Sequence, residues 1–175
     1  MAGNTEAEAR DIAHRIAQET DFLEQEARAR GERFERRDEE ALVAKLTEET
    51  TKTPFFNAQS WGSGPPGGTI TYTAFIFNPD PVSYSGFWLF GYLFFGPANF
   101  IQNRDTALTV VDTRFPRYWQ RLGVASGASA SASFTVNIPS GITPGIYIGN
   151  CFLVQRDSFD VGDYFDRAAF DLTVT

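Results

Sequence analysis

The sequence has few of the residues that carry redox chemistry, acid–base chemistry or membrane insertion, with one cysteine and one histidine among 175 residues. Because Cys151 stands alone, no disulfide can form within the chain, and nothing indicates an oxidising compartment. The longest apolar run, Phe87–Phe95, is far shorter than the ~20 residues of a membrane-spanning helix. The start of the chain is charged, so we expect no secretory signal peptide. These absences predict a cytoplasmic protein, or a subunit of an assembly built from cytoplasmic subunits.

Charged residues are scarce in the second part of the chain and abundant in the first. Residues 1–53 hold 9 of the 15 basic and 14 of the 22 acidic residues, and residues 54–175 contain no lysine, glutamate or histidine. The net charge of −7 argues against a nucleic-acid partner, because such partners are held through phosphate contacts to basic residues. We therefore expect two domains, a charged one over 1–53 and a charge-poor one over 54–175.

The charge-poor region also lacks the groups that catalysis needs. A nucleophilic serine or cysteine must be activated by a neighbouring base, and the one histidine, His14, lies among charged residues of the other region. The glycine-rich segment Gly62–Gly68 lacks the lysine and the hydroxyl residue that end a phosphate-binding loop. We therefore expect a protein that is not an enzyme, with no catalytic residue, cofactor or metal.

Residues 5–49 contain no proline and are rich in alanine, glutamate, arginine and leucine, which favours a helix. The apolar residues recur at intervals of three, four and seven, so they lie on one stripe of that helix. A heptad frame through the stripe meets Arg30 and Arg37, and Gly31 predicts a bend between two shorter helices. The stripe comprises Ile12, Ile16, Leu23, Phe34, Leu42 and Leu46.

Two partners remain open for this thin apolar stripe. It can fold back on the following domain, since most helical stability comes from tertiary packing. It can also pack against copies of itself or against another protein subunit. We favour the second, an oligomerisation or docking arm, because so many charged residues leave little apolar surface for burial within the chain.

From Phe55 onward apolar residues alternate with polar ones, and Gly, Pro, Asn and Asp separate the segments. A period of two is that of a strand with one buried face, and no helical segment interrupts the series. We therefore expect a mainly β fold, an antiparallel sandwich of about seven or eight strands that follows the helical arm. The expected strands are 55–61, 69–78, 87–95, 107–112, 118–124, 131–138, 146–155 and 164–174.

Two turns in this region resemble those of a known family. The stretch from Ile138 to Tyr147, Ile-Pro-Ser-Gly-Ile-Thr-Pro-Gly-Ile-Tyr, is similar to the corner between the fifth and sixth strands of bacterial immunoglobulin-like domains of the cell-adhesion-related type. The turn from Asn78 to Asp80 is similar as well. The resemblance implies an immunoglobulin-like sandwich in which the Tyr147 ring enters the core and its hydroxyl returns to the upstream backbone. The paired cysteines and core tryptophan spacing of true immunoglobulin domains are missing, and the family implies binding or spacing, not a reaction.

An aromatic run marks the expected strand 87–95. Trp88, Phe90, Tyr92 and Phe94 would share one face and further large apolar residues the other, although only one face of each sheet in a sandwich is internal. The second face must therefore meet the helix, another subunit, a carbohydrate ring or a membrane surface. We favour the helix or a subunit, keep carbohydrate stacking on Trp88 or Tyr92 as the alternative, and rank a membrane last.

An acidic segment is the one candidate for a metal. Asp157, Asp160, Asp163 and Asp166 recur at every third residue, and a loop can gather such carboxylates around Ca²⁺. The spacing matches no EF-hand loop, and a solvated hairpin with aspartates at its turns explains the pattern as well. We favour the hairpin over the calcium site.

These features together favour a non-enzymatic structural subunit. Its helical arm would tie subunits together while the sandwich packs into a shell, a fibre or a decorated surface, with a copy of itself or another protein as the partner. One alternative is a carbohydrate- or small-ligand-binding sandwich on a helical tether. A lower alternative is a calcium-stabilised adhesin domain.

Overall fold

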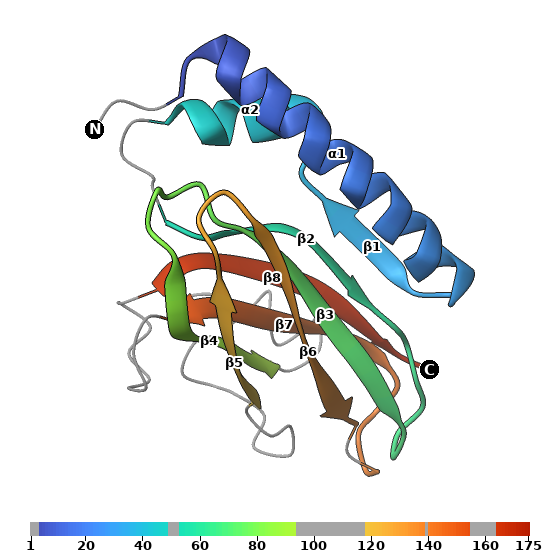
Figure 1. The fold of residues 1–175 in the computed structure, drawn as a ribbon. Coiled ribbons are helices and arrows are strands. Elements are labelled where there is room, and N and C mark those ends of the chain that lie inside the picture. The colour runs from blue at the N-terminus through green and yellow to red at the C-terminus, as the bar shows by residue number, and fades with distance from the viewer. Residues whose placement is uncertain (1–3, 49–52, 94–117, 139, 155–163) are drawn as a thin grey trace.

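The computed structural model describes residues 4–48, 53–93, 118–138, 140–154 and 164–175. The strands form a sandwich of two four-stranded antiparallel sheets, and the two helices lie before and after β1, the first strand in the chain (Figure 1). Sheet A has the strand order β1-β2-β3-β6, and sheet B has the order β5-β4-β7-β8. The elements are α1 (Glu6–Ala29), β1 (Arg33–Arg36), α2 (Glu39–Thr47), β2 (Phe55–Trp61), β3 (Thr69–Phe77), β4 (Tyr84–Leu93), β5 (Tyr118–Val124), β6 (Ser129–Asn137), β7 (Gly145–Val154) and β8 (Tyr164–Val174).

The mainly β fold is confirmed, with seven expected strands present as β2 to β8 and most of their bounds within two residues. The expected strand 107–112 lies outside the described residues. Within the described residues, no helix is long and apolar enough to cross a membrane.

The N-terminal region differs from a continuous helical arm. Gly31, with φ of +76°, ends α1, and the backbone N–H groups of Gly31 and Glu32 donate to the carbonyls of Arg28 and Ala27. After this cap the chain forms β1 before the second helix, α2, and β1 buries Phe34 between the exposed Arg33 and Glu35. β1 pairs antiparallel with β2, so the expected bend at Gly31 is a helix-to-strand turn.

The apolar stripe of the helices packs within the chain. Ile16 of α1 and Leu42 and Leu46 of α2 are buried in one cluster with Phe55 and Phe77, which lie at the ends of β2 and β3. Phe34 is buried in a second cluster with Ala27 and Ala58, and Leu23 packs against it. Ile12 packs against the first cluster. The side chains of the stripe face the chain's own sheet A, and the expected contact with a second copy or another subunit stays a prediction.

The inner faces of the two sheets enclose the main core. Trp61 and Tyr72 of sheet A stack on Phe170 of sheet B, with ring centroids 5.3 and 4.7 Å apart. The alternation expected for the strand 131–138 and for β8 is confirmed, since Ala132, Val136, Phe170, Leu172 and Val174 are all buried in this core. Aromatic packing of this kind contributes beyond the burial of apolar area.

The two turns quoted above have the geometry that the resemblance implies. Tyr147 is buried to 6% exposure in the core, and its hydroxyl donates to the carbonyl of Thr143 at 2.8 Å. Asn78 is fully buried, and its Oδ1 accepts from the N–H of Asp80 at 2.9 Å while its Nδ2 donates to the carbonyl of Val82. Both side chains thus hold a turn by bonding to nearby backbone.

The helices cover sheet A, whereas the aromatic strand β4 lies in sheet B. Both helix-packed clusters draw their sheet residues from β1, β2 and β3. β4 lies between β5 and β7, so its backbone is paired on both sides. In the described part of the chain the helices lie on sheet A, so of the two expected covers for the aromatic strand, the helix or another subunit, the subunit stays a prediction.

Candidate functional site

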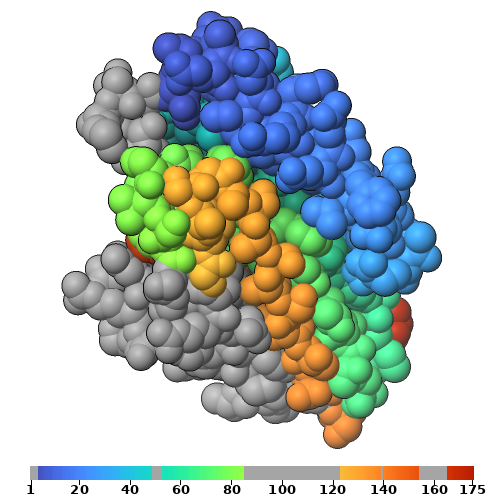
Figure 2. Space-filling model, in the orientation of Figure 1, coloured from blue at the N-terminus to red at the C-terminus, as the bar shows by residue number. Residues whose placement is uncertain are grey.

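A pocket of about 240 Å³ lies between α1 and the outer face of sheet A. Figure 2 shows the blue surface of α1 beside the green and orange surfaces of β3 and β6 on this side of the molecule. We call it the helix–sheet pocket. It is lined by Glu19, Thr20 and Leu23 of α1, Asn57 of β2, Phe75 and Ile76 of β3, and residues 129–131 of β6.

A bulge in β2 places a polar side chain beneath α1. The register between β2 and β3 shifts between Phe56 and Ala58, so Asn57 is the extra residue in its strand. The Nδ2 of Asn57 lies 2.9 Å from the Oγ1 of Thr20, and this hydroxyl lies 2.7 Å from the carbonyl oxygen of Ile16. The bulge therefore ties the sheet to the middle of α1 at the wall of the helix–sheet pocket.

Counting hydrogens assigns the amide of Asn57. The Thr20 hydroxyl has one hydrogen, and the Ile16 carbonyl can only accept, so that hydrogen is donated to Ile16. The Asn57 atom facing Thr20 must then be the donor Nδ2, which leaves Oδ1 as the buried acceptor, and this atom has no hydrogen-bond partner among the described residues. A buried acceptor without a partner is costly, and because solvent does not reach Oδ1, a molecule in the pocket can donate to it only if neighbouring side chains move.

The helix–sheet pocket has one charged lining residue, Glu19, which is exposed. The neighbouring acids of α1 are already engaged, since Arg36 pairs with Asp21 and lies 3.5 Å from Glu24. Arg36 also donates to the carbonyl of Ala17 at 3.2 Å, which holds the guanidinium against α1. Glu19 thus supplies an acidic group to a pocket whose lining contains no basic residue.

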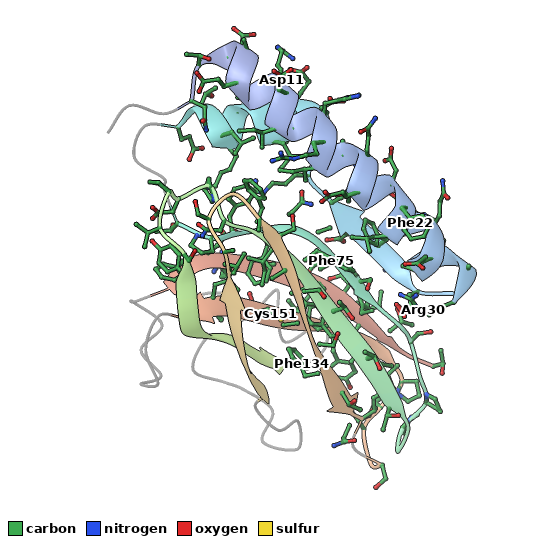
Figure 3. The ribbon with its side chains drawn as sticks, in the orientation of Figure 1. Asp11, Phe22, Arg30, Phe75, Phe134 and Cys151 are labelled. Atoms are coloured by element: carbon green, nitrogen blue, oxygen red, sulfur yellow. The ribbon has the colours of Figure 1, made fainter. Side chains whose placement is uncertain are left out.

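The apolar part of the helix–sheet pocket is formed by Leu23 and Phe75, which pack against the cluster around Phe34. The ring centroids of Phe34 and Phe75 lie 5.8 Å apart with an interplanar angle of 40°, so the Phe34 ring supports the Phe75 ring. Figure 3 shows Phe75 on the sheet beneath α1. Phe22, the residue before Leu23, is 62% exposed on the same helix. The pocket therefore combines one aromatic wall with several hydrogen-bond acceptors.

A second pocket, of about 160 Å³, lies where β1 and β2 meet β8 and contains three arginines in its lining. Two of these arginines are engaged within the chain. Arg37 donates from Nε to the carbonyl of Phe56 at 3.0 Å and lies 3.8 Å from the Asp166 carboxylate, and Arg36 is paired as described above. With these guanidinium groups committed to the fold, the second pocket is the weaker candidate.

The single cysteine lies in a buried polar group at the centre of the sandwich. Burial raises the pKa of the Cys151 thiol to about 12, and a hydrogen bond with Tyr72 opposes part of this rise. The Tyr72 hydroxyl donates to the Oε1 of Gln59 at 2.8 Å. A thiol that is buried and protonated at neutral pH is not a nucleophile.

The expected aromatic binding residues fall at the limit of the described structure. Trp88, Phe90 and Tyr92 belong to β4, where they pair in register with Val154, Phe152 and Asn150 of β7. The structure describes the backbone of these three residues and not their side chains, and Phe94 lies outside the described residues. Carbohydrate stacking on this strand therefore stays a prediction.

The expected acidic segment is described only at its end. Asp157, Asp160 and Asp163 lie outside the described residues, whereas Asp166 is the third residue of β8. The two carboxylate oxygens of Asp166 accept from the backbone N–H groups of Phe56 and Arg167 at 2.8 and 2.9 Å. Among the described residues no group of three His, Cys, Asp or Glu side chains could hold a metal ion, so calcium binding stays a prediction.

The sequence predicts no ligand site at the helix–sheet pocket. Leu23 belongs to the stripe predicted for oligomerisation, and Asn57 and Phe75 belong only to predicted strands. One signal was present: Asn57 interrupts the apolar residues of the strand 55–61, and a polar residue inside a buried strand marks a bulge or a buried bond.

Comparison with known proteins gives no family. No family model matches the chain, and no curated protein matches it. Among solved structures, the CARDB domain of PF1109 from Pyrococcus furiosus is 10% identical with a TM-score of 0.43, covering 70% of this chain and 93% of that one. A cycloisomaltooligosaccharide glucanotransferase from Paenibacillus is 13% identical with a TM-score of 0.45, covering 65% and 12%. The C-terminal domain of wzt is 12% identical with a TM-score of 0.42, covering 65% and 63%. The chain thus spans a small part of the glucanotransferase, and all three neighbours are β-rich domains of low identity.

Proposed function

We propose that the chain is a non-enzymatic, immunoglobulin-like β-sandwich subunit that associates with a copy of itself through the outer edge of β6. The observation that carries the proposal is a difference between the four sheet edges. Three of them carry features that deter or block the addition of another strand, and the described residues show none of these features at β6.

The edges at β1, β5 and β8 are guarded in different ways. β1 is four residues long and contains Arg33, Glu35 and Arg36, and β5 contains Arg121. Short and charged edge strands resist pairing with another chain. Along β8, side chains of β2 occupy backbone acceptors, since Gln59 donates to the carbonyl of Ala169 at 2.7 Å and Trp61 donates to that of Asp171 at 2.8 Å.

The edge at β6 is nine residues long and contains no charged residue and no proline. It pairs with β3 without a register shift, so no bulge bends it away. The N–H of Ile138, directly after β6, donates to Gly68 on the β3 side, and the direction of these bonds alternates along an antiparallel strand. The N–H and C=O groups of Ser129, Ser131 and Ser133 therefore point to the outer edge.

The proposal of a second copy, rather than an unrelated strand, is supported by the sequence of this edge. Residues 129–133 read Ser-Ala-Ser-Ala-Ser in both directions. Antiparallel pairing about Ser131 places serine opposite serine and alanine opposite alanine, and it keeps polar and apolar faces aligned across the joined sheet. A chain of net charge −7 also approaches its own copy most easily along an uncharged edge.

Sedimentation velocity of the full chain tests this proposal. We expect a monomer–dimer equilibrium at micromolar concentrations. The Ser133→Pro variant removes one outward N–H and should shift the chain to monomer, because proline is tolerated on an edge strand whose N–H faces outward. Ser133→Ala keeps that N–H and is the matched control, and Ser133→Lys repeats the test by charge if the proline variant fails to fold. Exposed strand edges associate at micromolar to millimolar concentrations. A chain that stays monomeric at about 100 micromolar, within that range, would therefore contradict the proposal.

A further inference from the structure

The helix–sheet pocket has the size of a site for a small organic molecule. An apolar cavity of about 150 Å³ is large enough to bind benzene. The helix–sheet pocket, at about 240 Å³, therefore accommodates a ligand of about ten non-hydrogen atoms. A ligand of this size can contact the ring of Phe75 and reach the polar groups of α1 and β2 at once.

The hydrogen-bonding groups of the pocket call for a donor. Glu19 supplies an exposed carboxylate, which accepts hydrogen bonds. The Oδ1 of Asn57 has no hydrogen-bond partner among the described residues, but solvent does not reach it. The Thr20 hydroxyl cannot donate to a ligand, because its hydrogen is committed to Ile16. The remaining side-chain hydroxyls, those of Ser129 and Ser131, can rotate to serve as donors or acceptors.

The charge of the pocket selects among donors. Glu19 is the one charged residue of the lining, and Arg36, the basic side chain held against the same stretch of α1, is neutralised by Asp21 and Glu24. An anionic ligand would meet the Glu19 carboxylate without a basic group to offset it. A cationic ligand gains from that carboxylate and from the face of the Phe75 ring.

We propose that the helix–sheet pocket binds a small organic ammonium ion with a ring-sized apolar body. The ammonium group donates to the Glu19 carboxylate, and the apolar body packs between Leu23 and Phe75. The pocket uses the side-chain face of Ser129 and Ser131, whereas the proposed self-association uses the outward backbone groups of the same strand. Probe binding by NMR and self-association by sedimentation velocity are therefore measured separately, and either can fail without the other.

Three probes of one shape test the class of ligand: benzylamine, benzyl alcohol and benzoate, titrated into ¹⁵N-labelled full chain and followed by NMR. We expect benzylamine to shift amide signals of residues around the pocket with a dissociation constant on the order of 1 mM, as suits a ligand of this size. Benzyl alcohol should bind at least threefold more weakly, and benzoate should not bind. Equal binding of all three probes, or no binding of benzylamine at 20 times that concentration, on the order of 20 mM, would overturn the proposal. Binding of methyl glucoside without binding of benzylamine would overturn it in favour of a carbohydrate site.

Two pairs of variants locate the binding in the pocket. Glu19→Gln should weaken benzylamine binding about fivefold or more, while Asp11→Asn, also an exposed acid of α1 but near its N-terminal end (Figure 3), should leave it unchanged. Ser131→Leu places a leucine across from Phe75 and should abolish binding by filling the pocket. Ser133→Leu, on the same face of β6 and outside the lining, is its control. Equal effects within either pair would overturn the proposed location.

Discussion

The N-terminal region and the sandwich bury their apolar side chains by different means. α1 and α2 contribute alanines and aliphatic residues, and ion pairs such as Arg10–Glu40 and Arg36–Glu24 surround them. The sandwich encloses aromatic rings and has few charged residues of any kind. A thin aliphatic stripe is enough for the helices because β2 and β3 supply the aromatic partners Phe55 and Phe77. The partition of charge therefore coincides with the division between a covering layer of helices and the sheet that it covers.

The largest loss of stability is expected from removing an aromatic ring from the core of the sandwich. Trp61 is fully buried, stacks on Phe170 and donates from Nε1 to the carbonyl of Asp171. Trp61→Ala should lower the free energy of unfolding by about 3–5 kcal/mol, since it opens a cavity between the sheets and leaves that carbonyl without its donor. Urea denaturation followed by circular dichroism measures this. Trp61→Phe keeps a ring and should cost clearly less; equal losses would contradict a role for ring packing.

The next largest loss is expected from shortening an aliphatic side chain between α1 and sheet A. Ile16→Ala should lower the free energy of unfolding by about 2–4 kcal/mol, because Ile16 is 1% exposed in the cluster that joins α1 to sheet A. Tryptophan fluorescence and far-ultraviolet circular dichroism should show the same shifted midpoint if helices and sandwich unfold together. Phe22→Ala, on the exposed side of α1, should change stability by at most about 0.5 kcal/mol. Equal small effects of both substitutions would mean that α1 does not pack on the sheet.

The ion pairs of the helical layer should contribute less to the free energy of unfolding than the buried apolar side chains. Their contributions should differ according to how exposed each pair is. Arg36→Ala should cost about 1–2 kcal/mol, because the Arg36 side chain is 20% exposed and also donates to the carbonyl of Ala17. Arg28→Ala removes an exposed pair with Glu24 and should cost at most about 0.5 kcal/mol. Thermal denaturation of the two variants compares them directly. If Arg28→Ala proved the more damaging of the two, the inference that Arg36 anchors β1 to α1 would fail.

The last prediction concerns two groups of the sandwich, Cys151 and Tyr84, which affect the free energy of unfolding only at alkaline pH. Burial raises the pKa of Cys151 from 9.0 to about 12, and burial together with the hydrogen bond to Asp80 raises the pKa of Tyr84 from 10.0 to about 12. Because both groups deprotonate first in the unfolded chain, their stabilisation is fully present below pH 9 and is lost as the pH rises toward 12.

Urea midpoints measured between pH 7 and 12 test this, and the decline should begin above pH 9. In Cys151→Ala the decline should begin only near pH 10, where Tyr84 starts to titrate in the unfolded chain. Identical dependence of the urea midpoint on pH in the original chain and in Cys151→Ala would show that the Cys151 thiol does not contribute to the loss of stability in alkali.

Much of the sandwich could be predicted from the sequence because its strands are buried on one face. Alternation in the strand 131–138 and in β8 placed the inward residues correctly, and the Tyr147 and Asn78 turns follow from local side-chain chemistry. β1 could not be predicted, because four residues within a helix-favouring composition become a strand only when β2 supplies a pairing partner.

The helix–sheet pocket and the direction of helix packing were beyond the sequence for a related reason. Periodicity identifies an apolar face but does not identify what covers it, so the stripe around Ile16 suits a second copy as well as sheet A. The role of Asn57 depends on a bulge and on its meeting Thr20, 37 residues away. The division into domains at residue 54 stays a prediction, although the two described parts share one apolar cluster.

The helices cover sheet A of the same chain, and isotope-filtered NOE spectroscopy tests this packing directly. In a uniformly ¹³C-labelled sample, we expect NOEs between the methyl groups of Ile16 and the ring of Phe55 or Phe77, the residues that share its cluster. In a mixture of labelled and unlabelled chains, the filtered spectrum should contain no such cross-peak. A cross-peak between Ile16 and either ring in the filtered spectrum would place the helix on a neighbouring molecule and contradict the account.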